Sequence, residues 1–216
     1  MHGYPQQTGR RISKPVPQLI NAVEGFARDH RLVGSFSLLA AAAVLTIPFE
    51  RAQARHFLHR ERDNQMTAAI DQLSKVKFTQ APFWLREGPG DWRQSHIVKN
   101  ANSVEHWVAR DGRHPLAKGA EDFLARKRTH EVLRTIRNAL AHGNIVYLNK
   151  DGEEREGDIV HYLAFLSRYE EGAEAQAQAE TYRVIVTTED EFLRFIKLWA
   201  NWISGPAIED RDMQAA

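Results

Sequence analysis

The chain contains no cysteine among its 216 residues, which excludes disulfide bonds, thiol catalysis and cysteine-based zinc sites. This composition fits a reducing compartment, and we expect a cytoplasmic protein. Neither sign of charge dominates, because the formal net charge is only +1. The chain as a whole therefore lacks the charge excess typical of nucleic-acid-binding proteins, and any such contact must come from a local patch.

Long hydrophobic runs are also scarce. The first residues contain no apolar segment, so we expect no secretory signal. Residues 32–49 form one uncharged run, but Gly34, Pro48 and several serine and alanine residues make it short and weakly apolar for a membrane span. We expect a buried central helix there and no membrane association. Residues 1–13 predict a disordered, basic N-terminal segment, and residues 207–216 predict a polar tail, around a single domain at 14–206.

Helical periodicity is clear in the first third of the chain. Pro15 and Pro17 introduce a first helix, and its apolar residues recur at helical spacing: Leu19, Ile20, Val23 and Phe26. A second helix is expected from Phe36 to about Arg62, with a kink or a break at Pro48, because proline has no backbone N–H. A third helix is expected at 66–76.

The middle of the chain is less regular. Residues 77–115 contain glycine pairs and three tryptophans without a clear period, which predicts a long ordered loop with a short helix near 103–109. Residues 116–142 return to a helical pattern, with a break expected near Gly119.

After Gly143 the period becomes alternating, which indicates strands. Three segments predict an antiparallel β-meander at about 144–187, namely 144–149, 158–167 and 181–187. Thr188 and Glu191 have the spacing of a capping box for a last helix. The apolar face of that helix is large: Phe192, Phe195, Ile196, Leu198, Trp199 and Trp202. The expected fold class is mainly α, with the meander inserted before the last helix.

Residues 129–143 combine a helical pattern with a stop signal and with polar side chains suited to phosphate chemistry. At about 100° per residue, one side of this helix is apolar: Val132, Leu133, Ile136, Ala139 and Leu140. Another side carries a polar stripe: Glu131, Thr135, Asn138 and His142. Gly143 follows directly, as expected where a left-handed residue ends a helix. His142 therefore lies in the last turn, where the helix dipole favours its protonated form.

The motif Arg137-Asn138-x-x-x-His142 resembles the Arg-x4-His signature of the HEPN superfamily (higher eukaryotes and prokaryotes nucleotide-binding domains). Together, residues 136–144 and 45–51 are similar to a branch known from bacterial plasmids and chromosomes, and the similarity covers most of residues 15–205. The resemblance implies an up-and-down helical bundle, a homodimer and an endoribonuclease in which Arg137 and His142 are the catalytic pair. It also implies a toxin or defence effector, with an antitoxin or regulatory protein as a partner.

These residue types suit cleavage of RNA by its own 2′-hydroxyl without a metal or cofactor. His142 can accept or donate a proton, because the reference pKa of histidine is near neutrality. Arg137 can stabilise the charge on phosphorus with paired donors. Asn138 is one helical turn before His142, where it can orient the imidazole or bind the substrate.

The spacing of the pair favours two copies of the chain. Five residues of helix separate Arg137 and His142 by about 7.5 Å of rise and roughly 140° of rotation. One helix presents such a pair poorly to a single phosphate, whereas two helices related by a two-fold axis can share a cleft. The small Ala141 would permit their close approach.

Other interpretations stay open. A histidine before a C-terminal glycine often only bonds a carbonyl, and an arginine on a helix flank often only forms an ion pair. A non-catalytic module that binds RNA, a nucleotide or a partner protein is the main alternative. Two features favour it: the near-neutral charge, and Asn144 at the position where some toxin branches carry a tyrosine.

Further candidates lie outside the motif. Arg134, Arg51 and Arg55 could contact RNA, although residues 51–62 are also typical of a solvated helix face. Glu50 and Arg51 are expected to have a structural role. His56 and His59 share a helix face, but no further ligand is at supporting spacing, so we expect no metal site.

Overall fold

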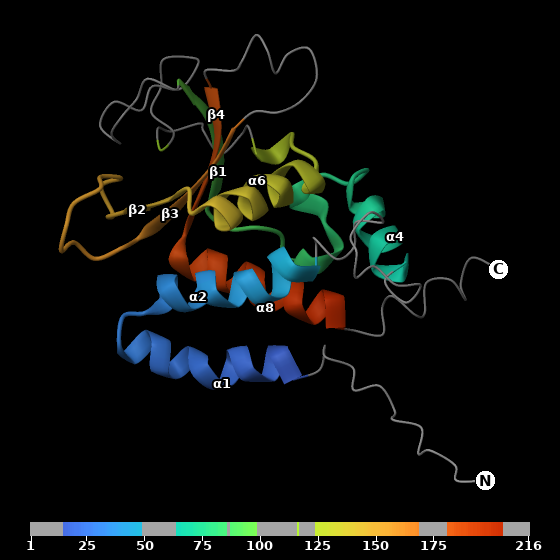
Figure 1. Ribbon diagram of the computed structural model, residues 1–216, viewed down its shortest axis with the longest axis horizontal. Coiled ribbons are helices and arrows are strands. Elements are labelled where there is room, and N and C mark those ends of the chain that lie inside the picture. The colour runs from blue at the N-terminus through green and yellow to red at the C-terminus, as the bar shows by residue number, and fades with distance from the viewer. Residues whose placement is uncertain are drawn as a thin grey trace.

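The computed structural model describes residues 15–48, 64–85, 87–98, 116, 124–168 and 181–204, and it combines helices with one antiparallel sheet (Figure 1). The α-helices are α1 Pro15–Asp29, α2 Val33–Ala41, α4 Asn64–Leu73, α6 Thr129–His142 and α8 Glu189–Ser204. The strands are β1 Trp92–Val98, β2 Ile145–Leu148, β3 Tyr162–Arg168 and β4 Thr181–Thr188. A mainly helical class with an antiparallel sheet, as the sequence predicted, is confirmed.

The sheet has four strands in the order β1-β4-β3-β2. Its inward face packs on α6 and α8, and alternate residues of the strands enter the core there, such as Leu163, Phe165 and Ile185. The three strands expected after Gly143 are present as β2, β3 and β4, each antiparallel to its neighbour.

Strand β1 corrects the prediction of a loop at 77–115. All of residues 92–98 pair with β4, from Trp92 opposite Thr187 to Val98 opposite Thr181. The alternation that marks a strand is weak here because a polar residue, Gln94, occupies an inward position beside Trp92 and is itself buried. The segment before β1 is also core, since Phe78, Phe83 and Trp84 are buried.

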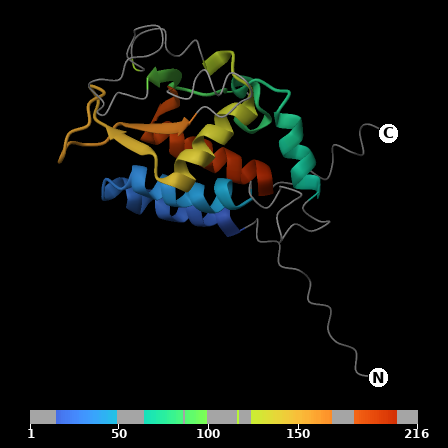
Figure 2. The same ribbon diagram turned by 45° about the horizontal axis from the view of Figure 1, so that its top comes forward.

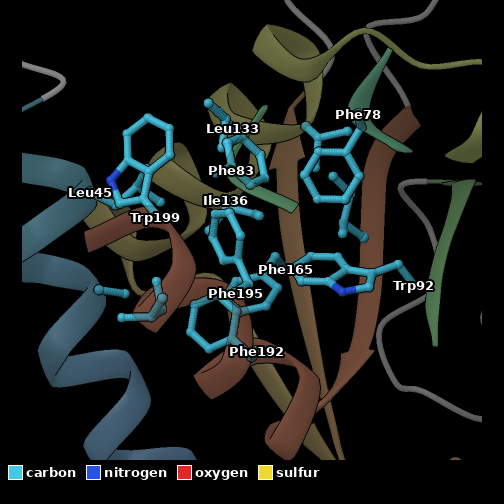
Figure 3. Close-up of a cluster of buried hydrophobic side chains, with 14 of the residues drawn as sticks. Leu45, Phe78, Phe83, Trp92, Leu133, Ile136, Phe165, Phe192, Phe195 and Trp199 are labelled. Atoms are coloured by element: carbon cyan, nitrogen blue, oxygen red, sulfur yellow. The ribbon is translucent and has the colours of Figure 1, made fainter. Parts of the chain in front are cut away.

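Aromatic side chains fill the centre of the core (Figure 3). Phe195 of α8 contacts the rings of Phe83, Trp92 and Trp199 with centroid distances of 5.6, 5.5 and 6.4 Å. Aromatic pairs at such distances prefer the tilted and edge-on arrangements seen here. The apolar face expected for the last helix is thus confirmed, with Phe192, Phe195 and Trp199 fully buried.

The second helix changes its hydrogen-bond register before Pro48. Residues Ala42–Thr46 form a π-helical turn that follows α2. In an α-helix the carbonyl of Val44 would accept from residue 48, but proline has no N–H to donate. The indole N–H of Trp199 donates to that carbonyl instead, at 2.8 Å. A side chain of α8 thus takes the place of the missing donor, whereas the kink or break predicted at Pro48 stays a prediction, because the described residues end there.

Helices α1 and α2 form an antiparallel pair that packs on α8 (Figures 1 and 2). The helix predicted after Pro15 is present, but its apolar residues do not all face the core. Ile20 and Ala27 are buried, whereas Leu19 and Phe26 are 62% and 58% exposed. The physical reason is that Ile20 and Ala27 are one heptad apart and face the core together, with Glu24 between them bonded to Lys197 of α8.

The helix predicted at 116–142 is also wrong in its length. The chain leaves helical structure at 126–128, where Arg128 forms an isolated antiparallel bridge with Lys77, and α6 begins at Thr129. The segment 76–78 provides hydrogen bonds to the chain at this point: Phe78 N donates to Lys127 O, and Thr129 N donates to Val76 O. These tertiary bonds replace those that a continuous helix would make.

Some predictions lie outside the described residues. They concern the chain ends at 1–13 and 207–216, the segment 51–62 with Arg51, Arg55, His56 and His59, Glu50, the short helix at 103–109 and the break at Gly119. The up-and-down bundle and the single domain at 14–206 stay predictions. Among the helices that the structure describes, none is long and apolar enough to cross a membrane.

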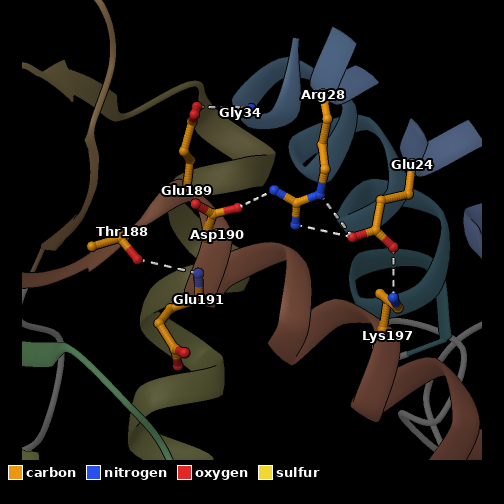
Figure 4. A network of polar contacts seen from close by, with 8 residues as sticks. All are labelled: Glu24, Arg28, Gly34, Thr188, Glu189, Asp190, Glu191 and Lys197. Carbon is orange, nitrogen blue, oxygen red and sulfur yellow. Dashed lines mark hydrogen bonds and ion pairs between the residues drawn. The ribbon is translucent and has the colours of Figure 1, made fainter. Parts of the chain in front are cut away.

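Polar contacts join α8 to the pair α1–α2 (Figure 4). Glu24 accepts hydrogen bonds from Arg28 and Lys197, and Arg28 also bonds Asp190. The Glu189 carboxylate accepts the backbone N–H of Gly34 at 3.1 Å, in the first turn of α2. Half of the predicted capping box is present, because Thr188 Oγ1 accepts the Glu191 N–H.

The hydrogen bond between Thr188 and Glu191 measures 3.2 Å, but the Glu191 carboxylate does not return to the cap. It accepts the Gly90 N–H at 2.9 Å and a hydrogen bond from Arg194 at 3.0 Å. The start of α8 therefore contacts the turn that precedes β1.

Two carboxylates of this network have pKa values shifted in opposite directions. Hydrogen bonding from Lys197, with help from Arg28, holds the pKa of Glu24 below its ordinary value. Burial raises the pKa of Glu189, and the neighbouring Asp190 adds to the effect, although the Gly34 N–H opposes it. Glu24 therefore contributes stability that is lost as pH falls, whereas Glu189 contributes stability that is lost as pH rises.

We predict opposite pH dependences for Glu24→Gln and Glu189→Gln. Relative to the parent protein, Glu24→Gln should lose stability at pH 7 and converge with it only below about pH 4, the reference pKa of glutamate, as pH falls through the lowered pKa of Glu24. Glu189→Gln keeps an acceptor for Gly34 and should gain stability at pH 7, again converging toward acid pH. Urea unfolding across this range measures both. Parallel curves for the two variants would contradict the assignment.

Candidate functional site

Helix α6 carries the Arg-x4-His motif and is fixed at both ends. At its start, the Glu131 carboxylate accepts the backbone N–H of Arg128 at 2.9 Å, and Thr129 Oγ1 donates to Val76 O at 3.0 Å. At its end, Gly143 has φ 69°, and its N–H returns to the carbonyl of Ala139. The stop expected at Gly143 is confirmed.

The motif side chains differ in exposure. His142 and Arg134 are exposed, whereas Arg137 and Asn138 are half-buried. The predicted apolar side of α6 is confirmed, because Val132, Leu133, Ile136 and Ala139 have no exposed surface. Because His142 is exposed, its imidazole at the end of the helix is accessible to a ligand.

The polar stripe of α6 faces the sheet. The Asn138 amide donates to Ser167 Oγ of β3 at 3.1 Å, and Ser167 is only 6% exposed. Seven residues earlier, Glu131 forms an ion pair of 3.6 Å with Arg183 of β4. Thr135, between them on the helix, is buried and bonds the carbonyl of Glu131.

Arg183 places a buried positive charge beneath the motif helix. Its side chain is 5% exposed, and a charge at such a site is tolerated only with a partner. Burial acts to raise the pKa of Glu131, but the Arg128 N–H and the nearby charges of Lys127, Arg183 and His130 outweigh it and lower that pKa. Glu131 therefore stays ionised, as the partner of Arg183 must.

The exposed strip of α6 lies between the two motif side chains. Viewed along the helix at about 100° per residue, Arg134 and Ala141 are within roughly 20° of each other. Arg137 flanks this strip on one side, and Asn138 and His142 flank it on the other. The single chain thus displays Arg137 and His142 on either side of a strip that carries a small residue, Ala141.

A cavity of about 580 Å³ exists elsewhere in the molecule. It is bordered by the α1–α2 turn, residues 157–160 and the start of α8, and its polar lining includes Arg28, Arg31 and Glu189. No motif residue lines it. Within the described part of the chain, no group of three or more histidine, aspartate or glutamate side chains could hold a metal ion.

Sequence interpretation did not identify Ser167 and Arg183. A signal was available, because each is a polar residue two positions from an inward-facing apolar one, Phe165 and Ile185, and so has the inward phase of its strand. The two residues are opposite each other in the β3–β4 register. Their proximity to Asn138 and Glu131 depends on tertiary structure and could not be read from local spacing.

The comparison with protein families gives a match over most of the chain. The family described as HEPN pEK499 p136 matches residues 32–208, which include all of α6 and most of the other described elements. Neither the comparison with curated proteins nor that with solved structures gives a significant match.

We predict opposite effects of alanine at two open glycines. A Cβ at Gly143 or at Gly25 would meet no atom within 4 Å, so only the backbone distinguishes them. Gly143→Ala places alanine in a left-handed conformation and should lower the free energy of unfolding by about 1–2 kcal/mol. Gly25→Ala, inside α1, should raise it by roughly 0.5–1 kcal/mol. Chemical denaturation measures both, and stabilisation by Gly143→Ala would refute the left-handed end of α6.

Proposed function

Because the chain belongs to the HEPN pEK499 p136 family, we propose that it is a metal-independent endoribonuclease with its active site on α6. One observation carries the proposal: the Arg-x4-His motif lies in the last turns of α6, with His142 exposed immediately before the left-handed Gly143. In a chain of this family, this position supports a catalytic role over a purely structural one.

The proposed chemistry needs a proton-transfer group and a fixed cation. The 2′-oxygen attacks the adjacent phosphorus as its proton leaves, and the departing 5′-oxygen gains a proton. His142 accepts the first proton while water supplies the second, or water accepts the first while His142 donates the second. Arg137 stabilises the added negative charge with its planar donors. The P–O5′ bond breaks, which leaves a 2′,3′-cyclic phosphate on one fragment and a 5′-hydroxyl on the other. Asn138 supports this pair.

The proposed active site lies between two copies of the chain. Arg137 and His142 flank the strip of Arg134 and Ala141, so a second α6 packed on that strip would approach both of them. Arg137 of one copy and His142 of the other would then face one phosphate. Arg134 on the same strip, and Arg51 and Arg55, are the proposed contacts for the rest of the RNA.

The biological role proposed is that of a toxin or defence effector that an antitoxin or another regulatory protein inhibits. A nuclease without cofactor requirement needs such control, because its substrate is present in every cell.

We predict that the purified protein cleaves single-stranded RNA in excess EDTA and leaves 2′,3′-cyclic phosphate ends. His142→Ala should lower kcat by about 10²–10⁴-fold, the usual contribution of a general acid or base. Arg137→Ala should lower it by roughly 10²–10³-fold, as when one stabilising donor is removed. Gel assays and end-group analysis measure these effects.

Matched controls are His30→Ala and Arg155→Ala. His30 is an exposed histidine that bonds a carbonyl at the end of α1, and Arg155 is an exposed arginine paired with Glu153. Both variants should cleave like the parent protein. Cleavage that requires a divalent metal, or that survives both motif substitutions, would exclude this mechanism. RNA binding without cleavage or growth inhibition would instead favour the non-catalytic module.

We predict that two inactive variants restore activity when mixed. In a shared site, a heterodimer of Arg137→Ala and His142→Ala chains has one intact site and one that lacks both groups. Equal mixing should recover about a quarter of the parent activity, since half of the dimers are mixed and each has one working site. No recovery after verified subunit exchange would place both groups of each site in one chain.

A further inference from the structure

The two contacts between the polar stripe of α6 and the sheet fix the rotation of this helix about its axis. Glu131 and Asn138 are seven residues apart, so they share one side of α6 and lie about 10.5 Å apart along it. Glu131 contacts Arg183 of β4, and Asn138 contacts Ser167 of β3. Because Ser167 and Arg183 are register partners, both contacts reach the same level of the sheet.

The rotation of α6 decides where the motif side chains point. On the circumference of the helix, Asn138 lies between Arg137, at roughly 100° on one side, and His142, at roughly 40° on the other. Side-chain tips lie about 5–6 Å from the axis, so a rotation of about 20° displaces both tips by about 2 Å. A misplacement of about 1 Å can lower the rate of an enzyme about 100-fold.

We propose that Ser167 and Asn138 are positioning residues for Arg137 and His142, and that the Ser167–Asn138 hydrogen bond sets the rotation of α6 at its catalytic end. This inference rests on the proposed function. The Glu131–Arg183 ion pair secures the other end of the same stripe. Asn138 then acts on the reaction through α6, because its amide N–H donates to Ser167 of the sheet and not to the RNA.

Burial supports this assignment. Ser167 is 6% exposed and Asn138 is half-buried, so the hydrogen bond between them lies away from open solvent. Such a bond has a larger effect on geometry than an exposed one, because an unmade buried bond is costly to either partner. The segment of β3 beneath it is held by β4, since the β3–β4 pairing runs from Tyr162 to Arg168 and includes Ser167 opposite Arg183.

The test combines Ser167→Ala, Asn138→Ala and the double variant, with Ser167→Thr as the conservative replacement. Ser37→Ala is the matched control, since Ser37 is also buried but its hydroxyl bonds the Gly34 carbonyl within α2. We expect Ser167→Ala to lower kcat about 10–100-fold with KM for RNA nearly unchanged. Ser167→Thr should restore kcat, and Ser37→Ala should leave it unchanged despite a similar loss of thermal stability.

The double variant separates positioning from direct contact. If Asn138 acts through Ser167, the double variant should be no slower than the slower single variant. Multiplying effects, or a parent-like kcat for Ser167→Ala, would overturn the inference while leaving the nuclease proposal intact.

A spectroscopic measurement keeps the two proposals distinguishable if the parent protein does not cleave RNA, an outcome that would contradict the proposed function. The NMR resonances of the His142 ring and of the amides along α6 should shift in Ser167→Ala and return in Ser167→Thr. Shifts confined to the neighbours of residues 138 and 167 would overturn the positioning role.

Discussion

The burial of the aromatic face of α8 is the constraint on which the rest of the fold depends. Phe195 contacts rings from segments more than a hundred residues earlier, including Phe78 and Trp92, as well as neighbours on its own helix. Fully burying one such side chain contributes about 1.5–3 kcal/mol. These contacts bring the turns at 78–84 and strand β1 against α8, and β1 completes the sheet on which α6 rests.

A second layer, polar and mostly buried, lies between α6 and the sheet. Arg183 forms an ion pair with Glu131, and the hydroxyl of Ser167 accepts a hydrogen bond from the Asn138 amide. Apolar packing alone would let a helix settle at several rotations, whereas a buried ion pair and a hydrogen bond admit few. The polar layer therefore specifies the orientation of α6, while the aromatic core supplies most of the stability.

Local patterns predicted the elements that are rich in apolar residues, even where a polar residue such as Ser167 or Arg183 is buried on the inward face. Helix α8, the apolar side of α6 and strands β2 to β4 were of this kind, and Gly143 marked the end of α6 correctly. Strand β1 was missed because Gln94 interrupts its inward face. The start of α6 at Thr129 depends on hydrogen bonds from Val76, which no local pattern contains. The motif was recognisable, but its contact with Ser167 requires the folded sheet.

The order of the elements along the chain has a consequence for biosynthesis. Strands β3 and β4 and helix α8 all follow α6, and β1 pairs with β4, which is made much later. A ribosome-bound chain that ends soon after Gly143 contains the motif. It lacks β3 and β4, which contact α6, and it lacks α8, which provides much of the core. The residues of the proposed active site are thus without their support until the last helix emerges from the ribosome, so that site can form only when synthesis of the chain is nearly complete.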